Sequence, residues 1–197
     1  MPTGVAIRDV REQLFGAAER VLLRDGPNAL TSRAVTTEAG CAKGVLHKHF
    51  TDFDAFLAEF VLDRIARLDE RTAALRDAAG TGTVADNLTG AVTALFSSAA
   101  LALVGLITAR DELRARLRRD LPAGVPVLTE AAELIAAYLA AERDLGRIAP
   151  AADVDTLAAM LIGTTHLRHA GRDTPPDPDT VRRIVTAVLA TSGRLPM

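Results

Sequence analysis

Apolar side chains recur along most of the chain at the three- and four-residue spacing of amphipathic α-helices. The first such run holds Ile7, Val10, Leu14, Ala17 and Val21, with charged residues between them. Similar runs cover residues 52–68, 127–145, 153–170 and 179–191. The sequence shows no strand signal and no internal repeat. This pattern predicts an all-α chain of about nine helices.

Local signals divide the beginning of the chain into shorter helices. The first helix ends at residues 25–27, Asp-Gly-Pro, because glycine accepts a positive φ and proline cannot continue the helical hydrogen bonds. Thr31 is a typical N-cap residue, and Leu30 and Val35 have the spacing of a hydrophobic staple. These signals predict a second helix over residues 32–39.

A third helix follows the second almost at once. Gly40 ends the second helix, and the third covers residues 43–50 before a new cap at Asp52. Two short helices joined by a turn of about three residues, with glycine first, predict a helix-turn-helix motif. The chain has only two lysines, Lys43 and Lys48, and both fall on the second helix of this motif.

The formal charge of −2 over 197 residues does not indicate a nucleic-acid partner. The charge is unevenly distributed, however, because residues 1–50 hold seven Lys and Arg against five Asp and Glu, whereas residues 51–197 hold sixteen against twenty. A helix that enters the major groove needs cations and small polar groups for phosphate contacts. The local charge therefore favours DNA binding by the helix-turn-helix motif.

Residues 26–60, and residues 30–50 above all, resemble the DNA-binding domain of the TetR family of one-component regulators. The resemblance implies an N-terminal three-helix helix-turn-helix domain over residues 1–51, followed by a helical ligand-binding and dimerisation domain over residues 52–197. It also implies that Leu46 and Phe50 face inward. The family positions that contact DNA match Thr31, Ser32, Arg33, Lys43, Gly44, Val45, His47, Lys48 and His49.

Two positions depart from the family pattern. His47 stands where the family usually has a tyrosine that binds phosphate, and Phe53 stands where a lysine is common. The phenylalanine removes one phosphate contact per subunit. Because log K falls by about 0.9 for each such contact as log salt rises, we expect a shallower salt dependence than in relatives that carry the lysine.

A palindromic operator requires a two-fold dimer, because two recognition helices must lie about one helical turn apart, ~34 Å. The family dimerises through its last two long helices, where apolar and small residues form stripes in this sequence. The alternative is that both stripes face the subunit's own core. The expected interface residues are Leu157, Leu161, Thr164, Thr165, Arg168, Val181, Ile184, Val185, Val188 and Leu189.

The middle of the chain is the expected sensor of a small, largely apolar effector that releases the protein from DNA. A mostly apolar cavity with a few orienting polar groups is typical of such sites. The alternative is that these residues only fill a core. The expected pocket residues are Phe96, Leu103, Leu106, Ile107, Arg110, Leu128, Ile135, Tyr138, Leu139 and His166.

Residues 87–109 carry no charge and are long enough to span a bilayer. Polar residues interrupt the stretch and no aromatic belt flanks it, so we expect one buried helix at the centre of a bundle, and no membrane partner. Lone Cys41 and the lack of an apolar signal segment favour the cytoplasm.

The sequence gives enzyme hypotheses little support. It contains no HExxH, ExxH, GKS/T or GxSxG pattern, so we expect no catalytic residues, no metal and no cofactor. His166 and His169 lie at i and i+3, but no further ligand accompanies them. The prediction is a ligand-responsive repressor that binds DNA as a homodimer. The alternative is a helical protein-interaction or structural module that does not bind DNA.

Overall fold

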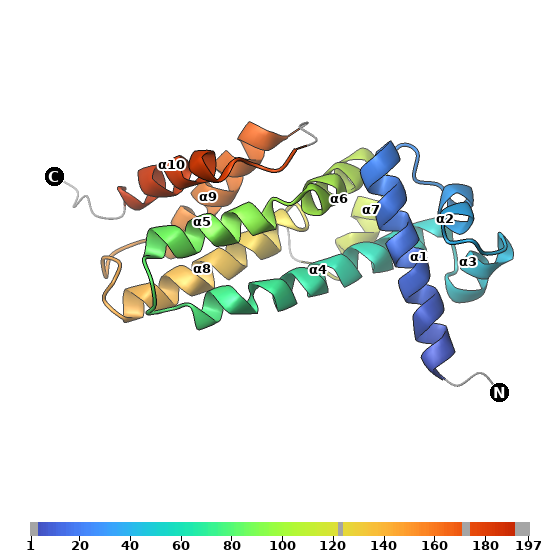
Figure 1. Cartoon of the computed structure of the whole chain (residues 1–197), viewed down its shortest axis with the longest axis horizontal. Coiled ribbons are helices and arrows are strands. Elements are labelled where there is room, and N and C mark those ends of the chain that lie inside the picture. The colour runs from blue at the N-terminus through green and yellow to red at the C-terminus, as the bar shows by residue number, and fades with distance from the viewer. Residues whose placement is uncertain (1–3, 122–123, 171–173, 192–197) are drawn as a thin grey trace. The chain divides into compact units, whose positions relative to one another are not determined.

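The computed structural model describes residues 4–121, 124–170 and 174–191, and every regular element in these ranges is an α-helix (Figure 1). The prediction of an all-α fold is confirmed, with ten helices in the described residues where about nine were expected. The helices are α1 (Gly4–Asp25), α2 (Ser32–Glu38), α3 (Gly44–His49), α4 (Phe53–Asp77), α5 (Val84–Leu95), α6 (Ser98–Ala109), α7 (Asp111–Leu117), α8 (Leu128–Asp144), α9 (Val154–His169) and α10 (Pro178–Leu189).

The chain forms two compact units. The first comprises residues 1–64 and 102–126, and the second comprises residues 65–101 and 127–197. Helices α4 and α6 each contribute residues to both units.

An aromatic cluster forms the core of the first unit. The Phe15 ring of α1 lies 5.6–5.9 Å, between centroids, from the rings of Phe50, Phe56 and Phe60. All four side chains are buried, and Phe50 meets Phe56 edge-on at 5.0 Å. Edge-to-face aromatic pairs add to the stability that burial provides. The cluster joins α1 and the start of α4 to the residue that follows α3.

The core of the second unit lies among α5, α8, α9 and α10, which pack side by side (Figure 1). Leu88, Ile135, Leu139, Leu161 and Val185 are fully buried there. Three of these helices begin at the side chain of a polar residue that accepts a backbone N–H, as N-caps do: Thr83, Asp153 and Asp177.

The uncharged stretch at residues 87–109 differs from its prediction. The expected single helix is divided between α5 and α6, which are bent by 55° at Phe96 and Ser97. The hydroxyls of Thr89 and Thr93 each donate to a carbonyl four residues earlier, a contact that often bends helices. Among the described residues, no single helix is long and apolar enough to cross a membrane, although this bent pair meets the criterion by length and composition.

Candidate DNA-contacting surface and effector cavity

Two inward-facing side chains hold the short helix α3 in place. Leu46 is fully buried within the helix, and Phe50, which follows it, belongs to the aromatic cluster. The guanidinium of Arg11 lies 4.6 Å from the centroid of the Phe50 ring, which is cation–π distance. Six residues form too short a helix to be stable alone, so this packing determines where α3 lies.

None of the nine candidate DNA-binding residues is buried. Thr31, Arg33, Lys43, Gly44, His47 and Lys48 are exposed, and Ser32, Val45 and His49 are half-buried. The Oγ atom of Ser32 is buried without a hydrogen-bond partner among the described residues. Within the part of the chain that the structure describes, neither lysine takes part in an ion pair. The charges of Lys48, on α3, and of Lys43, the residue before it, are therefore available to an anionic partner.

The helix α2 begins and ends on defined contacts. The Thr31 hydroxyl accepts the N–H of Ala34 at 3.1 Å, as the sequence predicts for an N-cap. Glu38, near the other end, accepts from Arg20 at 2.7 Å and from Arg24 at 2.9 Å, both on α1. These arginines, Arg20 first, hold the pKa of Glu38 below its usual value. The ion pairs fix α2 against α1.

The turn between α2 and α3 needs its glycine. Gly40 has a φ of +65°, which a residue with a Cβ rarely adopts. The N–H of Cys41 then returns to the carbonyl of Thr36 at 3.0 Å, and the Gln13 side chain donates to the carbonyl of Ala39 at 2.7 Å. The sequence predicted the glycine, but no local signal identified Gln13 as a partner of the turn.

Arg110, which was expected to line the effector pocket, lies in the first unit. Its Nη2 donates to the carbonyl of Leu30 at 2.6 Å, and its guanidinium lies 5.6 Å from the ring centroid of Phe53. Arg116 pairs with Asp52 at 3.0 Å. The run of arginines at 110–119 has the charge pattern of a solvated helix face, and that pattern gives no sign of these two contacts.

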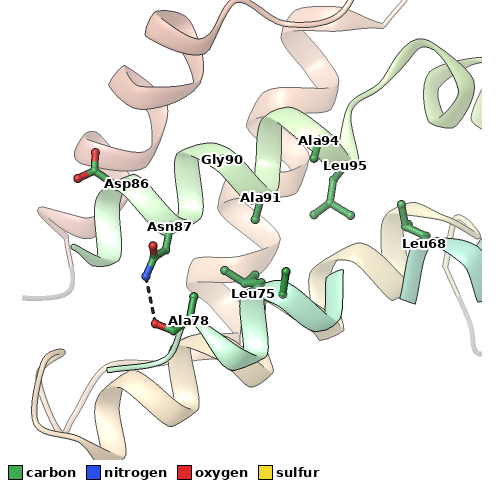
Figure 2. A pocket seen from close by; sticks show the side chains of 10 residues that line it. Leu68, Leu75, Ala78, Asp86, Asn87, Gly90, Ala91, Ala94 and Leu95 are labelled. Carbon is green, nitrogen blue, oxygen red and sulfur yellow. Dashed lines mark hydrogen bonds between the residues drawn. The ribbon is translucent and has the colours of Figure 1, made fainter. Parts of the chain in front are cut away.

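A cavity of about 420 Å³ lies between α4 and α5 in the second unit (Figure 2). Small side chains line much of it and leave its volume open, while leucines provide apolar surface. The lining residues are Leu68, Ala74, Leu75, Ala78, Asp86, Asn87, Gly90, Ala91, Ala94 and Leu95. None of the ten predicted pocket residues is among them.

Hydrogen bonds already occupy the polar groups of this cavity. The Asn87 amide donates to the carbonyls of Ala78 and Thr81 and to the hydroxyl of Tyr138, at 2.9–3.3 Å, and Figure 2 shows the bond to Ala78. Asp86 pairs with Arg182 at 2.7 Å and accepts the hydroxyl of Thr83 at 2.6 Å. The surface that remains for a ligand is mainly apolar.

A buried polar cluster extends from Asn87 into the protein. Burial, and then a hydrogen bond to Glu142, raise the pKa of Tyr138 to about 12, so the phenol stays protonated. Glu142 is completely buried, accepts the N–H of Gly80 at 3.2 Å and lies 3.3 Å from Arg147. This cluster connects the loop between α4 and α5 to the end of α8.

The other predicted pocket residues mostly fill cores. Phe96, Ile135, Tyr138 and Leu139 are buried in the core of the second unit, whereas Leu103, Leu106 and Ile107 are buried residues of the first. Leu128 and His166 are half-buried. The Nδ1 of His166 is buried without a hydrogen-bond partner among the described residues.

The predicted dimer residues divide into two groups. Leu157, Leu161, Thr165, Val181 and Val185 are buried within this subunit. Thr164, Arg168, Ile184 and Val188 line a groove of about 380 Å³ between α9 and α10, although Ile184 and Val188 are also buried, and Leu189 is half-buried. Met160 also lines this groove, and nearby Leu167 is 81% exposed.

Residues 14–60 match the model of the family described as bacterial regulatory proteins, tetR family. The matched segment contains all nine candidate DNA-binding residues and the aromatic cluster. No curated protein gave a significant match to the chain.

Solved structures share the fold over almost the whole chain. A TetR transcription regulator from Haloarcula marismortui ATCC 43049 has a TM-score of 0.69 at 17% identity, covering 94% of this chain and 98% of that one. FadR from Bacillus subtilis, solved in complex with stearoyl-CoA, has a TM-score of 0.66 at 18% identity, with 93% and 99% covered. A transcriptional regulator from Rhodococcus sp. Rha1 has a TM-score of 0.66 at 21% identity, with 92% and 95% covered.

The fold and the exposed recognition helix define a helix-turn-helix DNA-binding protein whose class of function is transcription regulation. Residues 14–60 match the TetR-family model, so the resemblance inferred from the sequence is confirmed over this segment. Regulators of this family are generally not enzymes, which agrees with the expectation from the sequence.

Proposed function

We propose that this protein is a ligand-responsive repressor that binds a palindromic operator as a homodimer and is released by a small, largely apolar effector. The observation that carries the proposal is the helix α3 with its two flanking residues: Leu46 and Phe50 are buried, whereas Lys43 and Lys48 are exposed and form no ion pair within the described residues. A short basic helix held in this way is suited to the major groove. Operator binding would require the protein to work in the cytoplasm, in contact with the DNA.

DNA contact divides into two roles in this proposal. Arg33 reads a base edge, because a bidentate arginine–guanine pair is the commonest specific contact. Ser32, Lys43, His47 and Lys48 bind phosphates, and Val45 offers an apolar surface to a thymine methyl group. Thr31, Gly44 and His49 complete the surface, with Gly44 allowing the backbone to approach the groove closely.

Dimerisation uses the exposed edge of α9 and α10. The groove formed by Thr164, Arg168, Ile184 and Val188, together with the exposed Met160, supplies apolar and polar surface for an isologous interface. Interfaces of this kind need apolar side chains at their centre and polar groups at the rim. The buried residues among those predicted for the interface pack beneath this surface in the core of the second unit.

The effector site in this proposal is the cavity between α4 and α5. Its volume is suited to a small molecule, and its lining favours uncharged, hydrocarbon-rich compounds. A structural neighbour was solved with stearoyl-CoA, which supports an effector that carries an apolar chain. The effector must bind better to a conformation that does not fit the operator, because equal binding to both states shifts nothing.

Selection from a pool of random DNA duplexes tests the proposal and identifies the operator in the same experiment. The purified protein should enrich a palindrome whose half-sites lie about one helical turn apart, ~34 Å. In vitro transcription from a promoter that overlaps the enriched site should fall when the protein is added. If no sequence is enriched and no duplex is retarded at low salt, the alternative of a helical interaction module replaces this proposal.

A further inference from the structure

Two arginines of the segment at residues 110–117 hold both ends of the helix-turn-helix. Arg110, the residue before α7, donates to the carbonyl of Leu30, one residue before the N-cap of α2. Arg116, on α7, pairs with Asp52, one residue before α4. All nine candidate DNA-binding residues lie between these two attachment points, in residues 31–51. The segment formed by α7 and the residue before it therefore contacts the chain immediately before and immediately after residues 31–51.

Further contacts support each attachment point. Leu30 is fully buried, so its carbonyl is fixed in position. Asp52 accepts the N–H of Ala55 at 2.7 Å through its other oxygen, and this bond, together with Arg116, holds the pKa of Asp52 below its usual value. The Phe53 ring beneath Arg110 stacks on Phe56 of the aromatic cluster at 5.7 Å.

The contact between the Arg110 guanidinium and the Phe53 ring also gives a reason why a phenylalanine stands at position 53. The family commonly has a phosphate-binding lysine at this position, and a lysine would supply no ring for Arg110. A guanidinium over an aromatic face is stabilised by cation–π attraction, which a second cation would replace with repulsion. In this protein, the side chain at position 53 therefore contacts Arg110 and helps to hold the helix-turn-helix, whereas a lysine there would bind a DNA phosphate.

We infer that Arg110 and Arg116 are positioning residues for operator recognition, which rests on the proposed function. They hold the helix-turn-helix in one orientation on α7, so that the recognition helices of a dimer meet their half-sites at a single spacing. Neither residue needs to touch DNA. Their loss changes the choice among DNA sites more than the attraction to DNA in general.

The test compares binding to a selected operator with binding to an unrelated duplex of equal length. We expect Arg110→Ala plus Arg116→Ala to weaken operator binding about tenfold and leave the unrelated duplex within about twofold. The penalty for adding one base pair between the half-sites should shrink. A purely structural role would lower the folded fraction and weaken both duplexes equally, which would overturn the proposal.

Three further measurements separate the alternatives. Arg114→Ala is the matched control, because Arg114 pairs with Asp111 on α7 and donates to the carbonyl of Thr108 on α6 but contacts neither attachment point, and it should leave both affinities unchanged. Arg116→Lys keeps the charge opposite Asp52 and should rescue most of the loss caused by Arg116→Ala. The salt slope should stay constant in all variants, because a lost phosphate contact would reduce it by about 0.9 and show that the arginines bind DNA themselves.

The same assay distinguishes failure of this inference from failure of the proposed function. If the wild-type protein selects no site, the proposed function fails. If the wild type selects a site and the double variant keeps both its affinity and its spacing preference, only the inference fails. Because Arg116 and Asp52 form a partly exposed pair, Arg116→Ala alone should remain folded and give a result by itself.

Discussion

At the scale of single residues, the nine candidate DNA-binding residues differ in whether they can distinguish one DNA sequence from another. Lys48 presents a flexible point charge, whereas Arg33 presents a planar group with paired donors. Both are exposed, so substitution should affect DNA binding more than folding. Removing the positive charge of Lys48 should therefore lower the affinity for DNA of any sequence, whereas removing that of Arg33 should change the preference for one base pair.

We expect Lys48→Ala to weaken binding to all duplexes by a similar factor, because a phosphate contact carries no sequence information. The salt slope should fall by about 0.9. Arg33→Ala should instead cost about 1–3 kcal/mol on the operator and relax the preference at one base pair. Parallel titrations of operator and single-base variants measure both effects, and identical behaviour of the two proteins would refute the assigned roles.

At the scale of helices, the sequence predicted structure best where signals are local. Thr31 caps α2 as expected, and Gly40 has the positive φ that its position indicated. The break at Phe96 and Ser97 was missed because neither glycine nor proline marks it. The contact from Arg110 to Leu30 was also missed, because a bond across 80 residues leaves no periodic signal.

The cavity between α4 and α5 was not predicted from the sequence either. Alanine and glycine were interpreted as part of a buried helix, and only the approach of α4 to α5 shows that their small size leaves space. At Gly90, an added Cβ would meet nothing within 4 Å. This position therefore allows the cavity to be filled without a clash at the backbone.

Gly90→Leu and Gly90→Ala form a matched pair for testing the cavity. Both should raise the free energy of unfolding by about 0.5–1 kcal/mol through helix propensity. Only leucine should fill the space and weaken binding of the neutral dye Nile red, about tenfold, or about 1.4 kcal/mol. Fluorescence titration measures the affinity, and equal binding by the two variants would show that the dye binds elsewhere.

The buried cluster at the end of α8 predicts a large effect from a partly exposed residue. Arg147→Ala leaves the carboxylate of Glu142 buried without its cation, which should lower the free energy of unfolding by about 3 kcal/mol. Adding Glu142→Gln should restore part of this loss, since the amide carries no charge. Urea unfolding followed by circular dichroism measures both. A double variant no more stable than Arg147→Ala would mean that the ion pair contributes little.

At the scale of the whole molecule, the proposed activity depends on two copies. One six-residue recognition helix contacts few base pairs, so a single subunit has little specificity. Pairing of subunits doubles the readout and sets the distance between half-sites. Under the proposed function, the interface residues therefore influence DNA recognition without contacting DNA.

Met160→Glu should convert the proposed dimer to a monomer, because it places a charge in the groove between α9 and α10. Operator affinity should fall about 100-fold, or about 2.7 kcal/mol. Analytical ultracentrifugation measures the oligomeric state. Leu145→Glu is the control, since Leu145 is 58% exposed but follows α8, and it should stay dimeric. If Met160→Glu remained dimeric, the interface would lie on another surface.

The two attachment points of the helix-turn-helix also bear on how new specificity can arise. One of them is the carbonyl of Leu30, which any amino acid would supply, and the other is Asp52, outside the reading segment. Residues 31–51 can therefore be exchanged as one segment, provided that the new segment keeps the buried Leu46 and Phe50 and the carboxylate of Glu38 that pairs with α1. Under the proposed function, such a graft between the same two points redirects the protein to other promoters while the effector stays the same.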